Sequence, residues 1–142
     1  MASGVKTMGL MNIFSRDKVL IGMVHLLPLP GSPRYGGSLQ AILDRAVSDA
    51  QALASGGMDG CLVENSGDVP FSADSVGPET VAAMTAILTE IRRAAAIPLG
   101  VNVLKNDPRA ALAIAHATGA RFVRITVHAG VVVTGQGIIQ GD

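Results

Sequence analysis

The sequence predicts an α/β fold in which about four strand–helix units form part of an eightfold (β/α) barrel. Four short segments rich in Val, Ile and Leu alternate with segments of helical periodicity, and they cover residues 19–26, 61–63, 99–104 and 122–127. Each apolar segment ends in polar, loop-forming residues. In parallel α/β proteins, these carboxyl ends of the strands surround the ligand site. The pattern therefore predicts a small-molecule site at one end of a parallel sheet.

Three helices are expected between these strands, and capping residues mark their ends. The first begins after Ser38, a typical N-cap, and its apolar residues recur at helical spacing until the glycine pair at 56 and 57. The second begins at Pro78, because proline is favoured at the first helical position. The third begins after Asp107 and ends at Gly119. Since right-handed crossovers place consecutive strands side by side, the sheet should follow the order of the sequence.

The chain is too short for a complete barrel. Eight units take about 250 residues, whereas the fourth predicted strand lies close to the end of these 142 residues. We expect residues 129–142 to form a loop, residues 1–18 to be a disordered leader, and residues 19–142 to be the N-terminal half of a barrel, apparently truncated. A homo-oligomer in which two copies close one barrel, and an open doubly wound sheet, are the alternatives.

The composition argues against several function classes. Eleven Lys and Arg balance eleven Asp and Glu, and aromatic residues make up 3% of the chain, so we expect no nucleic-acid partner. The single cysteine, Cys61, excludes an internal disulfide and fits a reducing compartment. No apolar run reaches the roughly 20 residues of a transmembrane segment, so we expect a cytoplasmic protein. No ligand spacing indicates a metal, and no motif indicates an organic cofactor.

Alternation along the strands predicts which side chains face the barrel axis. The polar residues of this inward set are His25, Glu64, Asn102, Arg124, Thr126 and His128. An isolated charge on the axis would cost several kcal/mol, so Arg124 requires either Glu64 or a bound anion as a partner. Because alternate strands of a barrel share a layer of interior side chains, Glu64 and Arg124 are expected to pair, while His25 and Asn102 belong to the other layer.

These residues form a candidate site, and each of them also has a structural interpretation. We assign catalysis to Glu64, His25 and His128, because carboxylates and imidazoles exchange protons near neutral pH. A structural ion pair, a hydrogen-bonded core histidine and a solvated loop lysine are the alternatives for Glu64, His25 and Lys105. We assign substrate binding to the other polar residues near the strand ends, which are Asn102, Lys105, Arg124 and Thr126.

A set of short motifs together resembles the BtpA family. They include IGMVHL at residues 21–26, PLPGSP at 28–33, VEN at 63–65, PETV at 78–81, GVNVL at 100–104 and QGII at 136–139. The resemblance covers nearly the whole chain from about residue 19. It implies a TIM-type barrel of the ribulose-phosphate-binding kind, of which this chain would be the N-terminal half. The chain departs from the usual family pattern at Thr126, where many members carry Asn, and at Gly135, where an acid is usual.

Three functional hypotheses follow. The residues favour a protein that binds or converts a small phosphorylated or sugar-like metabolite by acid–base chemistry. The family name, which comes from a photosystem I biogenesis factor, implies instead a non-enzymatic assembly or stability factor that associates peripherally with a membrane. The third hypothesis is an inactive, truncated fragment. A fold alone does not decide among them.

Overall fold

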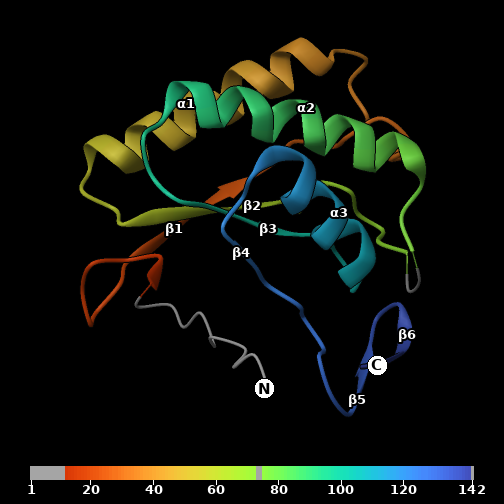
Figure 1. Cartoon of the computed structure of the whole chain (residues 1–142). Coiled ribbons are helices and arrows are strands. Elements are labelled where there is room, and N and C mark those ends of the chain that lie inside the picture. Colours follow the sequence, from red (N-terminus) through yellow and green to blue (C-terminus); the bar gives the residue numbers. More distant parts are fainter. Residues whose placement is uncertain (1–11, 73–74, 142) are drawn as a thin grey trace, which may run out of the picture.

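Four parallel strands form one sheet in the order of the sequence, β1-β2-β3-β4, in a computed structural model that describes residues 12–72 and 75–141 (Figure 1). The elements are β1 (Ile21–His25), α1 (Leu39–Ser55), β2 (Gly60–Glu64), α2 (Pro78–Ala94), β3 (Leu99–Asn102), α3 (Pro108–Thr118), β4 (Phe122–Val123), β5 (Val131–Thr134) and β6 (Gly137–Gln140). Each helix connects two neighbouring parallel strands. The predicted α/β class is confirmed, and the arrangement is consistent with part of a (β/α) barrel.

The helices begin and end where the capping residues predict. Ser38 Oγ accepts a hydrogen bond from the N–H of Ala41 at 3.2 Å, and Asp107 Oδ1 accepts one from the N–H of Ala110 at 2.9 Å. Each bond satisfies a backbone donor that a helix N-terminus otherwise leaves free. Gly119 ends α3 with φ +73°, a left-handed conformation that glycine adopts without steric cost.

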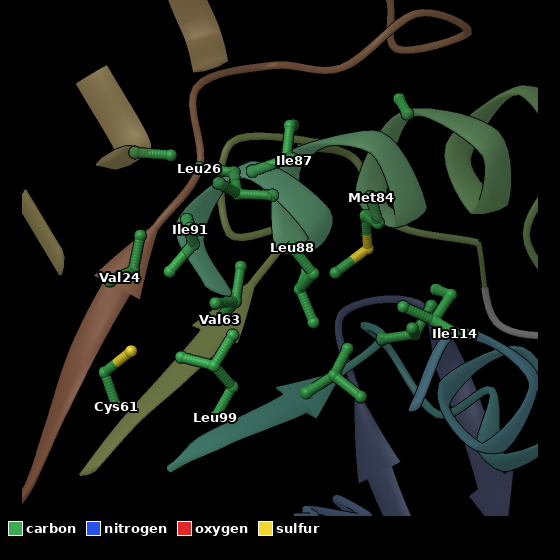
Figure 2. Close-up of a cluster of buried hydrophobic side chains, with 14 of the residues drawn as sticks. Val24, Leu26, Cys61, Val63, Met84, Ile87, Leu88, Ile91, Leu99 and Ile114 are labelled. Carbon is green, nitrogen blue, oxygen red and sulfur yellow. The ribbon is translucent and has the colours of Figure 1, made fainter. Parts of the chain in front are cut away.

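One face of the sheet packs against the helices and forms the hydrophobic core. Alternate strand residues supply this face, among them Val24, Cys61, Val63, Leu99 and Val101. Figure 2 shows the first four of these side chains opposite the buried residues of α2, namely Met84, Ile87, Leu88 and Ile91. Because successive side chains point to opposite faces of a strand, the remaining strand residues face away from the helices.

The opposite face of the sheet carries the residues expected on a barrel axis. Leu62 and Glu64 are buried on this face, and Gly100 leaves space for the ring of Phe122, since an added Cβ would lie 2.1 Å from that ring. The buried ring of Phe14 meets Phe122 edge to face, with ring centroids 5.8 Å apart. Phe14 belongs to the predicted leader, of which residues 1–11 lie outside the described residues.

The fourth strand is shorter than its alternation predicts. The sequence predicts a strand over residues 122–127, whereas β4 covers Phe122–Val123. β1 and β3 are also shorter than the predicted strands over residues 19–26 and 99–104. Beyond β4 the backbone finds another partner, because Asn106 Oδ1 accepts the N–H of Val127 at 2.8 Å and Asn106 Nδ2 donates to the Val127 carbonyl at 3.0 Å. A side chain therefore replaces the sheet as the hydrogen-bonding partner.

The prediction that residues 129–142 form a loop is wrong for most of this segment. Residues 131–134 and 137–140 pair as the antiparallel hairpin β5–β6, which projects from the end of β4 away from the helices (Figure 1). Gly137 adopts φ +105° at the turn. Two apolar runs that flank a Gly-rich turn are typical of a β-hairpin, so the sequence does contain a signal for this element. Several of its apolar side chains are exposed, namely Val131, Val132, Val133 and Ile138.

Candidate functional site

Three predicted site residues lie around the carboxylate of a fourth, Glu64. Asn102 Nδ2 donates a hydrogen bond to Glu64 Oε2 at 2.7 Å, and Arg124 Nη1 donates to the same oxygen at 3.2 Å. The other oxygen, Oε1, lies 3.8 Å from His25 Nε2, which is too long for a hydrogen bond. The predicted pairing of Glu64 with Arg124 is confirmed as a contact.

Glu64 also meets the residues that were assigned to the other layer. Residues His25, Glu64 and Asn102 occupy matching positions in the register of neighbouring strands. In the described residues the sheet has four strands, and β1, β2 and β3 end at these paired positions. Hence the carboxyl ends of β1, β2 and β3 bring both predicted sets to one carboxylate.

The four side chains differ sharply in exposure. The Glu64 side chain is 10% exposed, whereas those of His25 and Arg124 are 59% and 53% exposed. Asn102 is buried. Asn102 therefore holds the carboxylate from its buried side. His25 and Arg124 present an imidazole and a guanidinium to solvent on the face of the sheet that the helices do not cover. Such an arrangement can hold an anionic group and exchange a proton beside it.

The remaining predicted site residues lie elsewhere. Lys105 places its ammonium 5.6 Å from the ring centroid of Phe71, a cation–π contact. Thr126 and His128 are exposed on the segment between β4 and β5. Within the described part of the chain, no hydrogen bond or ion pair joins these three residues to Glu64. Their assignment to substrate binding or catalysis therefore stays a prediction.

Sequence analysis missed a buried polar network at the same end of the sheet. Asn65 Oδ1 accepts the N–H of Leu104 at 2.7 Å, and Asn65 Nδ2 donates to Asp68 Oδ2 at 3.0 Å. Asp68 Oδ1 in turn accepts the N–H of Leu29 at 2.7 Å. The network joins the loops that follow β1, β2 and β3. An Asn directly after a buried strand was the available signal, but its backbone partner Leu104 lies 39 residues further along the chain, and Asp68 meets Leu29 across the same separation.

Cys61 is buried in the core, and burial raises the pKa of its thiol from the ordinary 9.0 to about 11. The thiolate is the nucleophilic form, so at pH 8 the native chain should react with a disulfide reagent such as DTNB about a hundredfold more slowly than the chain unfolded in urea. The folded state holds the proton more tightly. The contribution of this thiol to the free energy of unfolding is therefore fully present below about pH 9, and it is lost as the pH rises to about 11. Equal rates for native and unfolded chain would contradict this prediction.

Comparison with known proteins identifies the family. The model of the BtpA family matches residues 16–142. The chain belongs to the BtpA family. It is 48% identical to the photosystem I biogenesis protein BtpA of Synechocystis over 135 residues, which cover 95% of this chain and 47% of that protein. It is 50% identical to an uncharacterized protein of Pyrococcus horikoshii, over 88% of this chain and 48% of the relative.

A third BtpA-family relative, an uncharacterized protein of Archaeoglobus fulgidus, is 52% identical over 88% of this chain and 50% of its own length. The chain thus spans about half the length of the curated relatives that it matches. Among the described residues, no helix is long and apolar enough to cross a membrane. Within the same residues, no group of three or more His, Cys, Asp or Glu side chains is placed to hold a metal ion.

Proposed function

We propose that this BtpA-family chain contributes to a cytoplasmic, metabolite-binding site in which Glu64 and His25 exchange protons with a small anionic, sugar-like ligand. The observation that supports this proposal most is the asymmetry of the Glu64 carboxylate. Neighbouring strands hold Oε2 at 2.7 and 3.2 Å, whereas Oε1 faces His25 at 3.8 Å. One oxygen is thus held by the protein, and the other is free to accept a proton from a ligand.

Each residue has a distinct role in this proposal. Glu64 is the general base or acid, and His25 is the group that relays the proton to solvent, because its ring is largely exposed. Arg124 binds an anionic group of the ligand with the part of its guanidinium that solvent reaches. Asn102 orients Glu64 and does not touch the ligand. The long His25–Glu64 distance is compatible with catalysis, since such contacts often shorten when a ligand binds.

The decisive test is exchange of a carbon-bound hydrogen. The chain, and in parallel the full-length relative from Synechocystis, is incubated in D₂O with a panel of ketose and aldose phosphates, and proton NMR monitors the loss of signals next to the carbonyl. We expect exchange with at least one compound. Glu64→Gln should reduce the rate by about 10²- to 10⁴-fold, because the amide has no basic oxygen and general-base catalysis contributes this much.

Two matched surface variants serve as controls. Glu90→Gln and Arg93→Met change the two members of an ion pair on α2, away from the hollow that His25 lines. Both should leave exchange unchanged, whereas Arg124→Met should weaken binding of the anionic compound. Exchange that is equally fast in Glu64→Gln and Glu90→Gln would refute the assigned role.

A second candidate is a non-enzymatic assembly factor for photosystem I proteins. Two observations favour it: the name of the Synechocystis relative, photosystem I biogenesis protein, and the exposed apolar side chains of the β5–β6 hairpin, which could contact another protein. If no compound exchanges hydrogen or raises the melting temperature, and the chain sediments with thylakoid membranes, this candidate replaces the first. An aggregated product of the expressed chain would instead favour the inactive-fragment hypothesis.

A further inference from the structure

A separate pocket of about 170 Å³ lies beside the Glu64 cluster, at the N-terminus of α2. Three parts of the chain form its walls: the loop after β1 at Gly31, the loop after β2 at Asn65 and Asp68, and the start of α2 at Glu79 and Thr80. The pocket lies on the side of Asn65, whereas the preceding residue, Glu64, points to the other face of the sheet. A volume of this size corresponds to about six water-sized groups.

The walls of this pocket are held in place before any ligand binds. Asn65 and Asp68 join the loops after β1, β2 and β3 through hydrogen bonds of 2.7 to 3.0 Å. On the opposite side, Asp107 Oδ2 accepts the N–H of Val76 at 2.9 Å, which fixes the entry into α2. A site with such prearranged walls loses little conformational entropy when a ligand enters.

Thr80 points to a ligand. It is 6% exposed and lines the pocket, yet its hydroxyl makes no hydrogen bond to any residue that the structure describes. The other threonines within α2 behave differently, because Thr85 and Thr89 donate to the carbonyls four residues earlier at 2.7 Å. Among the described residues, the fully buried side-chain atoms without a partner do not include the Thr80 hydroxyl, so solvent reaches this oxygen from the pocket. The Thr80 hydroxyl is therefore available to a molecule in the pocket.

The carboxylate of Glu79 occupies space that two glycines leave open. A Cβ at Gly77 would lie 2.1 Å from Glu79 Oε1, and a Cβ at Gly31 would lie 2.6 Å from the same atom. Gly77 has φ −71°, which any residue adopts. Glycine is therefore needed at this position because of the space that Glu79 occupies, not because of the backbone conformation. Within the described part of the chain, Glu79 has no ion-pair partner. The glycines thus allow an unpaired carboxylate to lie against the pocket.

From these groups we infer that the pocket binds a small, uncharged polyhydroxylated ligand such as a free sugar or polyol. Two carboxylates, Asp68 and Glu79, line the pocket, and none of its described lining residues is Lys or Arg. The two carboxylates disfavour a phosphate, and the Lys105 ammonium, which lies over the ring of the lining residue Phe71, is the described cation that opposes them. Carboxylate oxygens accept hydrogen bonds from hydroxyl groups. The Thr80 hydroxyl can both donate and accept, which suits the alternating groups of a sugar. The site does not depend on the proton exchange proposed for Glu64.

The test is a titration of the whole chain with D-ribose and D-glucose, each compared with its terminal phosphate ester, monitored by backbone amide NMR. We expect saturable shifts at amides around Thr80, with the neutral sugars bound more tightly than their esters. Thr80→Val, which keeps the side-chain shape, should weaken binding about five- to tenfold, and Glu79→Gln about tenfold or more. Gly77→Ala should weaken binding in the same way, because the new methyl group displaces Glu79 without removing it.

Matched controls come from the same helix. Thr89→Val and Glu90→Gln remove a hydroxyl and a carboxylate from α2 at residues outside this pocket, and both should bind the sugars within about twofold of the parent chain. Absence of saturable shifts with both sugars, or equal affinities in the pocket variants and the controls, would overturn the inference. Saturable sugar binding without carbon–hydrogen exchange would refute only the function proposed for Glu64, and exchange without sugar binding would refute only this pocket.

Discussion

Asn65→Leu is expected to lower the free energy of unfolding by about 2–5 kcal/mol, since each buried polar group left without a partner costs about 1–3 kcal/mol. Asn65 is 1% exposed and holds the N–H of Leu104 at 2.7 Å and the carboxylate of Asp68 at 3.0 Å. Leucine has nearly the same shape but no hydrogen-bonding group. The substitution therefore leaves the Leu104 N–H unsatisfied in the interior and removes one donor from the half-buried carboxylate of Asp68.

Urea unfolding monitored by circular dichroism measures this effect. The matched control is Asn12→Leu, because Asn12 is exposed and its replacement should change stability by no more than about 0.5 kcal/mol. The loops after β1, β2 and β3 lose a common tether in Asn65→Leu, so we also expect the pocket beside α2 to lose sugar binding. If Asn65→Leu is as stable as the Asn12→Leu control, the hydrogen bonds of Asn65 do not contribute to the free energy of unfolding.

Leu88→Ala is expected to destabilise the chain by about 2–5 kcal/mol, the range measured for large-to-small substitutions in protein cores. Leu88 is completely buried in α2, where it packs in the cluster between the helices and the sheet (Figure 2). Removing its isopropyl group loses apolar burial and leaves a cavity that the surrounding strands cannot fill without moving. A whole domain is stable by only about 5–15 kcal/mol, so this loss is large.

Leu112→Ala provides the matched control for this prediction. Leu112 lies on α3 and is 57% exposed, so the same chemical change should alter the free energy of unfolding by about 0.5 kcal/mol or less. Both variants are unfolded in urea under the same conditions, and the midpoints and slopes are compared. If Leu88→Ala unfolds at the same urea concentration as Leu112→Ala, the core does not lie between α2 and the sheet.

Helix ends and strand faces could be predicted from the sequence because local interactions set them. Ser38, Asp107 and Gly119 cap helices through contacts within a few residues, so their roles can be read without knowledge of the fold. The alternation of apolar residues in β2 and β3 likewise identified which side chains face the helices. These same local patterns led to the correct pairing of Glu64 with Arg124.

Apart from the pairing of Glu64 with Arg124, contacts between residues far apart in the chain could not be predicted in this way. The end of β4 depends on a hydrogen bond from Val127 to Asn106, and the pocket wall depends on a hydrogen bond between Asn65 and Leu104. The free hydroxyl of Thr80 is recognised only once the residues around it are known. The sequence alone determined the α/β class, the helix boundaries and the polar character of the strand ends. The tertiary structure decided that His25 and Asn102 share one carboxylate, and that a second pocket lies beside it, because hydrogen-bonding partners 38 or 39 residues apart are selected by packing rather than by local spacing.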